Sequence, residues 1–387
     1  MKKQNICIIG GNLTGLVTAI TLSKLNCQVD LITGNTNQNL SSNRTLAVSE
    51  NNLDFLNKLN INKFLRKEIW PCSIMKLYTE SKNKKFSEIF KINSDNRQKK
   101  ILYMIENSKM MKFMINKIKQ IKSISVKNHE EISEISTSGL LKSVKFNNNR
   151  FRYNLIIICA GNNSSLVKNL FNDQVIENSY KETSITTILH HSPLKNDTVR
   201  QIFLDNAILA LLPISNTKTS IVWSVKENII KKNDLLVKKK IKFYTKNYLQ
   251  NSTFATNIEY KDLKFFIRNE YYQDRTLLFG DALHVVHPFV GQGFNMTLRD
   301  LVCLEKILRK KINLGLDIGS SDMLSEFSKE TKPRNFAFSV SVDLLKNSFS
   351  IRNKYFKKIR NNILMILNRN NFVKDIFFNI ADKGFKF

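Results

Sequence analysis

A short turn containing three glycines separates a buried strand from a helix at the start of this 387-residue chain. Asn5–Ile9 is apolar enough for a buried strand, Leu16–Leu25 has helical periodicity, and Gln28–Thr33 is a second apolar strand. Two strands joined through a helix form a βαβ unit, which opens a parallel sheet. A glycine-rich turn in that context directs the first amides of the helix toward a pyrophosphate.

The turn departs from the usual dinucleotide pattern at two places. Asn12 stands where the second glycine of G-x-G-x-x-G is found, and Thr33 stands where an acidic residue binds a ribose. Asn tolerates positive φ better than most residues, but its side chain limits close backbone approach. By itself the turn leaves dinucleotide binding and a plain structural turn both open. Its candidate cofactor-binding residues are Gly10, Gly11, Asn12 and Gly15.

A second glycine-containing segment is more specific. A buried strand at Thr276–Phe279 leads into a turn with a carboxylate, and a helix follows over Gln292–Lys310. A carboxylate in such a turn accepts hydrogen bonds from sugar hydroxyls, and the helix N-terminus stabilises negative charge on a bound ring. The candidate cofactor-binding residues of this segment are Gly280, Asp281, Pro288, Gly291, Gln292, Gly293 and Asn295.

This segment resembles the second flavin motif of FAD-dependent aromatic-ring hydroxylases, and most closely that of the ubiquinone-biosynthesis hydroxylases. Three further stretches are similar to segments of the narrower family, and the resemblance runs in order to about residue 345. These stretches are Arg44–Ser49, Tyr103–Asn107, and Leu209–Ile214 followed by Val222 and Trp223.

The resemblance implies an α/β fold: a Rossmann-like FAD-binding domain with an inserted β-sheet substrate domain and a helical C-terminal region. Between these, periodicity predicts one helix over Leu53–Ile69, and a loop or an edge hairpin over residues 81–100. We expect residues 1–75 with 95–175 and 270–335 to form the FAD-binding domain, 76–94 with 176–269 the β-rich substrate domain, and 336–387 the basic helical region.

The resemblance also implies an activity. FAD would be reduced by NAD(P)H or another electron donor, and one oxygen atom of O2 would be transferred to the ring of a prenylated phenol. Arg44 and Asn107 would lie near the flavin. No catalytic base can be assigned; His190 and His191 lie in the β-rich region, where a structural role is the simpler interpretation.

The middle motif of the superfamily is altered. Ala160-Gly161-Asn162 replaces Ala-Asp-Gly, and Lys168 replaces an arginine, so together with Asn12 and Thr33 the adenosine half of the site is weakened. Two alternatives therefore stay open. One is another FAD enzyme of the same fold, such as a prenyl reductase; the paired tryptophans of a halogenase are absent. The other is a non-catalytic lipid-binding member of a ubiquinone-biosynthesis complex.

The chain is strongly basic, with 61 Lys and Arg against 32 Asp and Glu and a formal net charge of +29. The charges are spread along the sequence and no basic–aromatic motif accompanies them, so we expect no nucleic-acid partner. The five cysteines are scattered, and His284 and His287 have no Cys or His cluster beside them, so we expect no metal.

The C-terminal region could meet a lipid surface. From residue 344 to 374 there is no acidic residue, while Ile351, Tyr355, Ile359, Ile363 and Ile366 recur at helical spacing. Such a helix either lies on an anionic leaflet or packs its apolar stripe on the rest of the protein. We see no signal peptide and no spanning segment, so we expect a cytoplasmic protein, with binding to the inner face of the membrane as a further hypothesis. The basic residues are Lys346, Arg352, Lys354, Lys357, Lys358, Arg360, Arg369 and Lys374.

Overall fold

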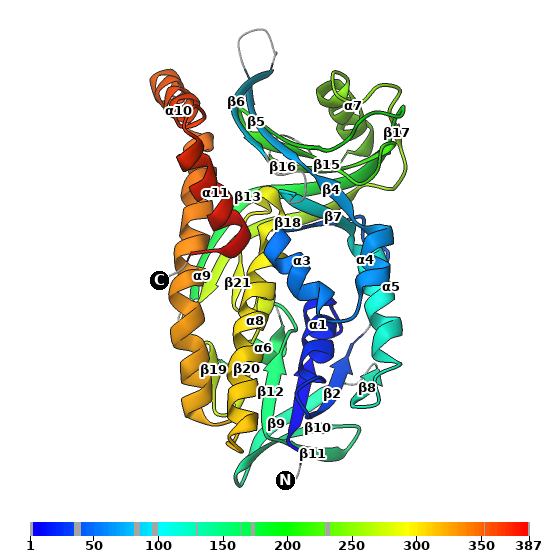
Figure 1. Cartoon of the computed structure of the whole chain (residues 1–387), viewed down its shortest axis with the longest axis vertical. Helices are drawn as coiled ribbons and strands as arrows, with labels where there is room; N and C mark the ends of the chain where they lie inside the picture. Colours follow the sequence, from blue (N-terminus) through cyan, green and yellow to red (C-terminus); the bar gives the residue numbers. More distant parts are fainter. Residues whose placement is uncertain are drawn as a thin grey trace.

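The computed structural model describes residues 3–34, 40–80, 86–94, 100–128, 131–162, 164–171, 175–227, 229, 233–351 and 353–385. These residues form a long molecule with a mostly parallel sheet in its lower half and a large, mostly antiparallel sheet in its upper half (Figure 1). Arg352, one of the cations of the C-terminal region, lies outside the described residues.

The lower sheet grows from the predicted βαβ unit. Its strands are parallel except at the β19–β20 pair. Three helices, α1 (Leu13–Leu22), α5 (Asn107–Ile118) and α8 (Gln292–Asn313), share one hydrophobic core with it. The strand order is β19 (Tyr272–Gln273), β20 (Thr276–Leu278), β12 (Leu155–Ile158), β1 (Asn5–Ile9), β2 (Gln28–Thr33) and β8 (Ile124–Asn128).

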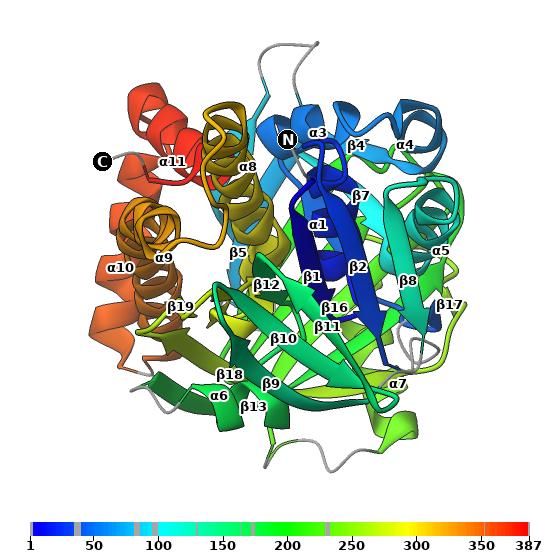
Figure 2. The same ribbon diagram turned by 90° about the horizontal axis from the view of Figure 1, so that it is seen from below.

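A small antiparallel sheet crosses the lower sheet, as the view from below shows (Figure 2). It consists of β9 (Ile132–Ser138), β10 (Leu141–Phe146) and β11 (Asn149–Tyr153). Only β10 was predicted from sequence, because β9 and β11 alternate polar side chains without a continuous apolar run. The short helix α6 (Ser165–Leu170) follows β12.

The upper sheet joins the central β-rich stretch to a hairpin from early in the chain. β5 (Ile74–Glu80) pairs in parallel with β14 (Thr198–Leu204), and β6 (Phe86–Asn93) forms the edge by pairing antiparallel with β5. Of the loop or edge hairpin predicted over residues 81–100, the described part is thus one strand of a hairpin whose other strand, β5, lies before residue 81. Helix α7 (Asp234–Thr245) packs on this sheet. The other strands are β13 (Val175–His190), β15 (Ala207–Pro213), β16 (Lys218–Lys226), β17 (Thr253–Phe254), β18 (Glu259–Arg268) and β21 (His284–Val285).

A three-stranded sheet lies between the two larger sheets, with the order β3 (Thr45–Val48), β7 (Leu102–Glu106) and β4 (Trp70–Cys72). The single helix predicted over Leu53–Ile69 is wrong. The chain forms α3 (Glu50–Asn57) and α4 (Asn62–Glu68), separated by a turn in which Asn60 has φ of 60°. A left-handed residue ends a helix, and Asn adopts that conformation readily.

The C-terminal region is helical, as predicted. Helix α9 (Ser321–Ser350) runs along the side of the molecule, and α10 (Lys354–Leu367) and α11 (Asn371–Lys383) lie toward its upper part (Figure 1). Across the described ranges, no helix combines the length and apolarity needed to span a bilayer.

The five cysteines are free and buried. Burial raises the pKa of Cys27 to about 11 and that of Cys159 to about 12, so their thiols are protonated and unreactive near neutral pH. The described residues contain no group of His, Cys, Asp and Glu side chains that could hold a metal ion.

Candidate cofactor site

The first glycine turn is pressed against β12. A Cβ on Gly10 would lie 2.8 Å from the backbone carbon and oxygen of Cys159, and one on Gly15 would lie 1.9 Å from the oxygen of Gly10. Gly10 also has φ of 130°, which other residues rarely adopt. These two positions therefore require glycine so that β1, α1 and β12 can approach one another.

Asn12 closes this turn with both ends of its amide. Its Oδ1 accepts a hydrogen bond from the Gly15 amide at 3.0 Å, and its Nδ2 donates to the Cys159 carbonyl at 2.7 Å. Its φ is −79°, so the tolerance of positive φ considered from the sequence is not used. Asn12 is instead the N-cap of α1. The amides of Leu13 and Thr14 have no hydrogen-bond acceptor among the described residues.

The second glycine segment meets the first turn directly. Gly280 has φ of 65°, and a Cβ there would lie 2.7 Å from Cγ2 of Thr14. Gly291 has φ of 66°, and its Cβ would lie 3.0 Å from the Cβ of Ala47 in β3. The Asp281 turn therefore packs against the first glycine turn, and the start of α8 packs against β3. Both contacts are possible only because Gly280 and Gly291 have no side chain.

The turn that contains Asp281 is fixed by a hydrogen bond from β18. It lies in the short 3-10 helix Gly280–Ala282, and the Leu283 carbonyl accepts a hydrogen bond from the Arg268 amide at 2.9 Å. The Asp281 carboxylate is exposed and has no hydrogen-bond or ion-pair partner among the described residues. An exposed, unpaired carboxylate on a rigid turn is ready to accept hydroxyl donors.

Residues behind this turn carry a buried polar network. His284 Nε2 lies 2.9 Å from Asp300 Oδ2, and Asn335 Nδ2 donates to the same carboxylate at 2.9 and 3.1 Å. His287 is buried too and lies 3.4 Å from Glu182, which pairs with Lys346 at 2.9 Å. These contacts tie both ends of the loop before Pro288 to α8, α9 and β13.

The side chain of Asn295 makes hydrogen bonds within the protein. Its Nδ2 donates to the Ala47 carbonyl at 2.8 Å, and its Oδ1 accepts from the Ser49 amide at 3.1 Å and from Asn52 at 2.9 Å. The side chain is fully buried. The Asn295 side chain is therefore not available to a ligand, and Gly291 caps the α8 N-terminus without a side chain.

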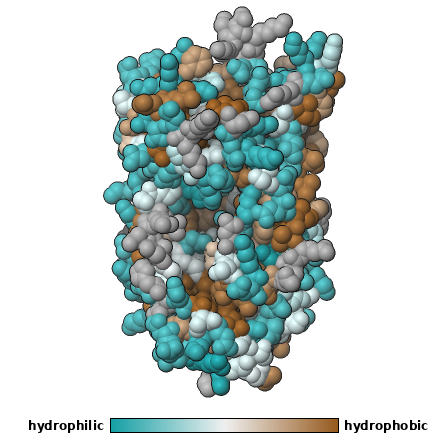
Figure 3. Space-filling model, turned by 180° about the vertical axis from the view of Figure 1, so that it is seen from behind, coloured by the Kyte–Doolittle hydropathy of each residue, from teal (hydrophilic) through white to brown (hydrophobic). Residues whose placement is uncertain are grey.

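Arg44 and Asn107, which the resemblance places near the flavin, are adjacent in the structure. The Asn107 amide donates to the Arg44 carbonyl at 2.9 Å, and Asn107 is the first residue of α5. The Arg44 side chain is exposed, with no hydrogen-bond or ion-pair partner among the residues described. Figure 3 shows the back face of the molecule hollowed between its upper and lower halves. We use the name central hollow for the place where the first glycine turn, the Arg44 segment and the Asp281 turn meet through the Gly280–Thr14 and Gly291–Ala47 contacts.

The part of the site that is expected to bind the adenosine half of FAD lacks a free carboxylate but has one free donor. Thr33 Oγ1 donates to Asn128 at 3.0 Å, and Asp30 accepts from the Tyr153 hydroxyl at 2.8 Å, so neither is a free ribose acceptor. Asn162 Nδ2 is buried and has no partner in the described part of the chain. This unused donor at the end of β12 is the kind of group that a bound ligand satisfies, and it was missed from sequence.

A sequence profile of the FAD binding domain family matches residues 3–337. The chain belongs to this FAD-binding family. One relative is the mitochondrial ubiquinone biosynthesis monooxygenase COQ6 of Dictyostelium discoideum, 24% identical over 97% of this chain and 90% of that protein. Among solved structures, p-nitrophenol 4-monooxygenase PnpA of Pseudomonas putida has a TM-score of 0.80 at 14% identity, covering 100% of this chain and 99% of that one.

FAD is the cofactor of this family's domain, and the residues present fit it. HpxO of Klebsiella pneumoniae, whose structure holds FAD and uric acid, has a TM-score of 0.77 at 12% identity over 98% of this chain and 97% of that one. Here Gly161 and Gly293 have open space beside them, and the free amides of α1 and the unpaired Asn162 donor supply hydrogen bonds of the right kind. The domain boundaries and the individual FAD contacts stay predictions.

Gly280→Ala should destabilise the protein, because the new methyl would meet Thr14 and the left-handed backbone adds about 1–2 kcal/mol of strain. Thr14→Ser removes the opposing methyl and should restore part of the loss. Thermal unfolding of the wild type, both single variants and the double variant measures this. An equal loss with and without Thr14→Ser would show that the contact does not set the spacing.

Asp281→Ala should lower the FAD content of the purified protein while leaving the fold intact. A charge-assisted hydrogen bond contributes about 1.5–3 kcal/mol, so FAD affinity should fall about tenfold or more. Asp54→Ala, an exposed carboxylate on α3, is the matched control. Absorbance of the bound flavin and circular dichroism report the two outcomes. Full flavin loading of Asp281→Ala would remove Asp281 from the site.

Proposed function

We propose that this protein is an FAD-dependent monooxygenase that hydroxylates the aromatic ring of a prenylated phenol in ubiquinone biosynthesis. The observation that carries the proposal is the meeting of three segments, 10–15, 44–48 and 280–295, at one hollow. A ubiquinone biosynthesis monooxygenase is 24% identical to this chain over 97% of its length, which supports the same activity. NAD(P)H or another donor and O2 are the co-substrates.

The residues at the hollow have distinct tasks. With FAD bound, the Asp281 carboxylate would accept hydrogen bonds from its sugar-chain hydroxyls, and the free amides of α1 would bind its phosphates. The N-terminus of the 22-residue helix α8 stabilises negative charge on the ring through its dipole. FAD, when bound, supplies the redox chemistry that activates O2. The Asn295 network holds β3 and α8 in the positions from which these groups act.

One face of the upper sheet is apolar and packs against the loop that contains Phe289, between the Asp281 turn and α8. In β15, Ala210 and Leu212 join the buried cluster that contains Phe289 of that loop, whereas Leu209 and Leu211 face the cluster under α7. The rings of Phe203 and Phe289 are 5.7 Å apart. An apolar wall beside the flavin suits a phenol with a prenyl chain and excludes water from the reacting ring.

His191 of the upper sheet is engaged within the protein. Nδ1 of His191 lies 2.9 Å from the Ser192 carbonyl and its Nε2 lies 2.9 Å from Thr219 Oγ1, so both ring nitrogens are used within the protein. This engagement favours a structural role for His191. His190 is exposed at the end of β13.

A deletion strain should accumulate an under-hydroxylated prenylated phenol and lose ubiquinone. Wild-type protein should restore the quinone, and Asp281→Ala should restore less of it because FAD binding is weakened. Quinone profiling by mass spectrometry distinguishes the alternatives. If the protein is a prenyl reductase, its deletion would leave ring hydroxylation unchanged and alter the saturation of the prenyl chain. If it is a non-catalytic member of a complex, Asp281→Ala would restore ubiquinone as fully as the wild type does. Either result would contradict the hydroxylase.

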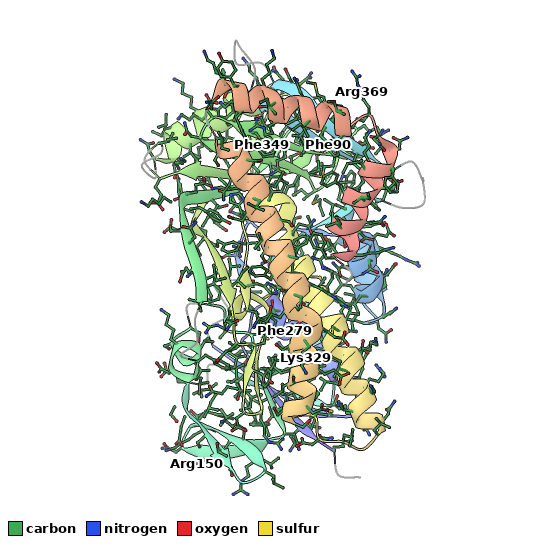
Figure 4. The ribbon with its side chains drawn as sticks, turned by 90° about the vertical axis from the view of Figure 1, so that its left-hand side faces the viewer. Phe90, Arg150, Phe279, Lys329, Phe349 and Arg369 are labelled. Carbon is green, nitrogen blue, oxygen red and sulfur yellow. The ribbon has the colours of Figure 1, made fainter. Side chains whose placement is uncertain are left out.

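We further propose that the C-terminal helices bind an anionic membrane surface, where a prenylated substrate resides. On α10, Tyr355, Ile359 and Ile366 are 81%, 57% and 65% exposed. The apolar stripe therefore does not pack on the described body of the protein. Helix α10 packs on the protein through Leu364 and Leu367 instead, which are partly buried against the core. In Figure 4, Arg369 lies at the outer edge of the molecule, whereas Phe349 and Phe90 lie beneath α10.

The structure divides the cations of this region into two groups. Lys346 is buried against Glu182, Lys357 pairs with Asp205, and the Arg360 guanidinium donates to the Ser348 carbonyl at 3.0 Å. These three are structural. Lys354, Lys358 and Arg369 are exposed, with no ion-pair partner among the described residues. They flank the apolar stripe and are free for lipid head groups, each contributing about 1 kcal/mol.

Lys354/Lys358/Arg369→Gln should weaken co-sedimentation with vesicles that contain anionic lipid, by about tenfold or more. The matched control is Lys239/Lys242/Lys246→Gln, which removes two exposed cations from α7 and a third at its C-cap. Binding of the wild type should also fall as salt is raised. Binding that ignores anionic lipid and salt, or an equal loss in both variants, would contradict membrane docking through α10. The same region could equally be tested against partner proteins of a ubiquinone-biosynthesis complex.

A further inference from the structure

Strand β18 connects two of the segments that border the central hollow. At its beginning, Glu259 Oε1 accepts a hydrogen bond from the Asn43 amide at 2.7 Å, next to Arg44. At its end, the Arg268 amide donates to the Leu283 carbonyl at 2.9 Å, and Arg268 Nε donates to the Ala282 carbonyl at 3.3 Å. The strand therefore runs from the arginine segment to the Asp281 turn.

Lys261 lies on this strand between the two attachments. It is two residues beyond Glu259, so its side chain leaves the strand on the same face as the carboxylate that holds the Arg44 segment. Tyr260 leaves on the opposite face, where its hydroxyl donates to Asp234 at the start of α7. Lys261 thus points toward the cofactor side of the upper sheet and not toward α7.

The Lys261 ammonium has no hydrogen-bond or ion-pair partner among the described residues. Its side chain is exposed, yet protein surrounds it closely enough that burial and the neighbouring Arg44 lower its pKa, while Asp281 acts in the opposite direction. Lys264 on the same strand differs, because its ammonium lies 2.6 Å from Glu177.

The Glu259–Asn43 hydrogen bond holds the beginning of β18, and with it Lys261, beside the Arg44 segment. Two like charges that lie near each other repel, and the repulsion is relieved when an anion lies between them. The diphosphate of FAD carries two negative charges in every redox state of the ring. We propose that Lys261, together with Arg44, binds the diphosphate of FAD. The proposal rests on FAD being the cofactor and concerns affinity only, independently of which substrate the protein oxidises.

This role offsets the altered adenosine side. Thr33 and Asp30 are engaged within the protein and offer no free carboxylate to the ribose. A second cation at the diphosphate supplies binding energy that the usual ribose contact would give. Lys261 is then a positioning residue that fixes the cofactor and takes no part in oxygen transfer.

FAD titration of the apoprotein tests the proposal, with Lys261→Gln, Lys261→Arg and the matched control Lys264→Gln. We expect Lys261→Gln to weaken FAD binding about three- to tenfold at low salt, a moderate effect because the site is exposed and screened. Lys261→Arg should keep most of the affinity, and Lys264→Gln should bind as the wild type does. The salt dependence of FAD binding should become shallower in Lys261→Gln.

Riboflavin separates the diphosphate from the ring, because it lacks phosphate. Riboflavin affinity should be the same in the wild type and Lys261→Gln, and the midpoint potential of bound FAD should not move. A lower potential with unchanged affinity for oxidised FAD would place Lys261 at the ring and overturn the proposal. Unchanged FAD affinity in Lys261→Gln, or an equal loss in Lys264→Gln, would overturn it as well. Neither outcome depends on hydroxylase activity, which the quinone profile of the deletion strain tests separately.

Discussion

The close approach of two glycine turns determines how the rest of this molecule is built. Gly280 lies against Thr14, and Gly15 lies against Gly10, at separations that leave no room for a Cβ. Because these contacts fix β1, β12 and the Asp281 turn relative to one another, the free amides of α1 and the exposed Asp281 carboxylate lie at the same hollow. Larger side chains at these positions would separate the two halves of the cofactor site.

Polar networks then hold the remaining segments against this centre. The Asn295 side chain joins α8 to β3, and the His284–Asp300–Asn335 cluster joins the Asp281 turn to α8 and α9. These groups are buried and fully engaged, so they act on the cofactor only through the positions that they impose. A buried network whose members are satisfied makes such positions rigid.

Much of this arrangement follows from local sequence. The glycine turns, the strands on either side and the long helix after Asn295 have short-range signals, and the family resemblance supplied FAD and the domain types. The roles of Asn12 and Asn295 could not be derived, because their partners, Cys159 and Ala47, are 147 and 248 residues away in the chain. The same holds for Lys261, which is an ordinary strand lysine in sequence. The split of residues 53–69 into two helices depends on the backbone of Asn60, which periodicity does not report.

The central claim is that the flavin of this protein places one atom of O2 on a phenol ring. The most direct measurement reduces the FAD-loaded protein with dithionite under anaerobic conditions, removes the excess reductant, and then adds ¹⁸O2 with a prenylated phenol. This bypasses the natural electron donor. The account predicts one ¹⁸O atom in a new ring hydroxyl of the product. A product with oxygen from water, saturation of the prenyl chain, or reoxidation of the flavin with no change in the phenol would contradict it.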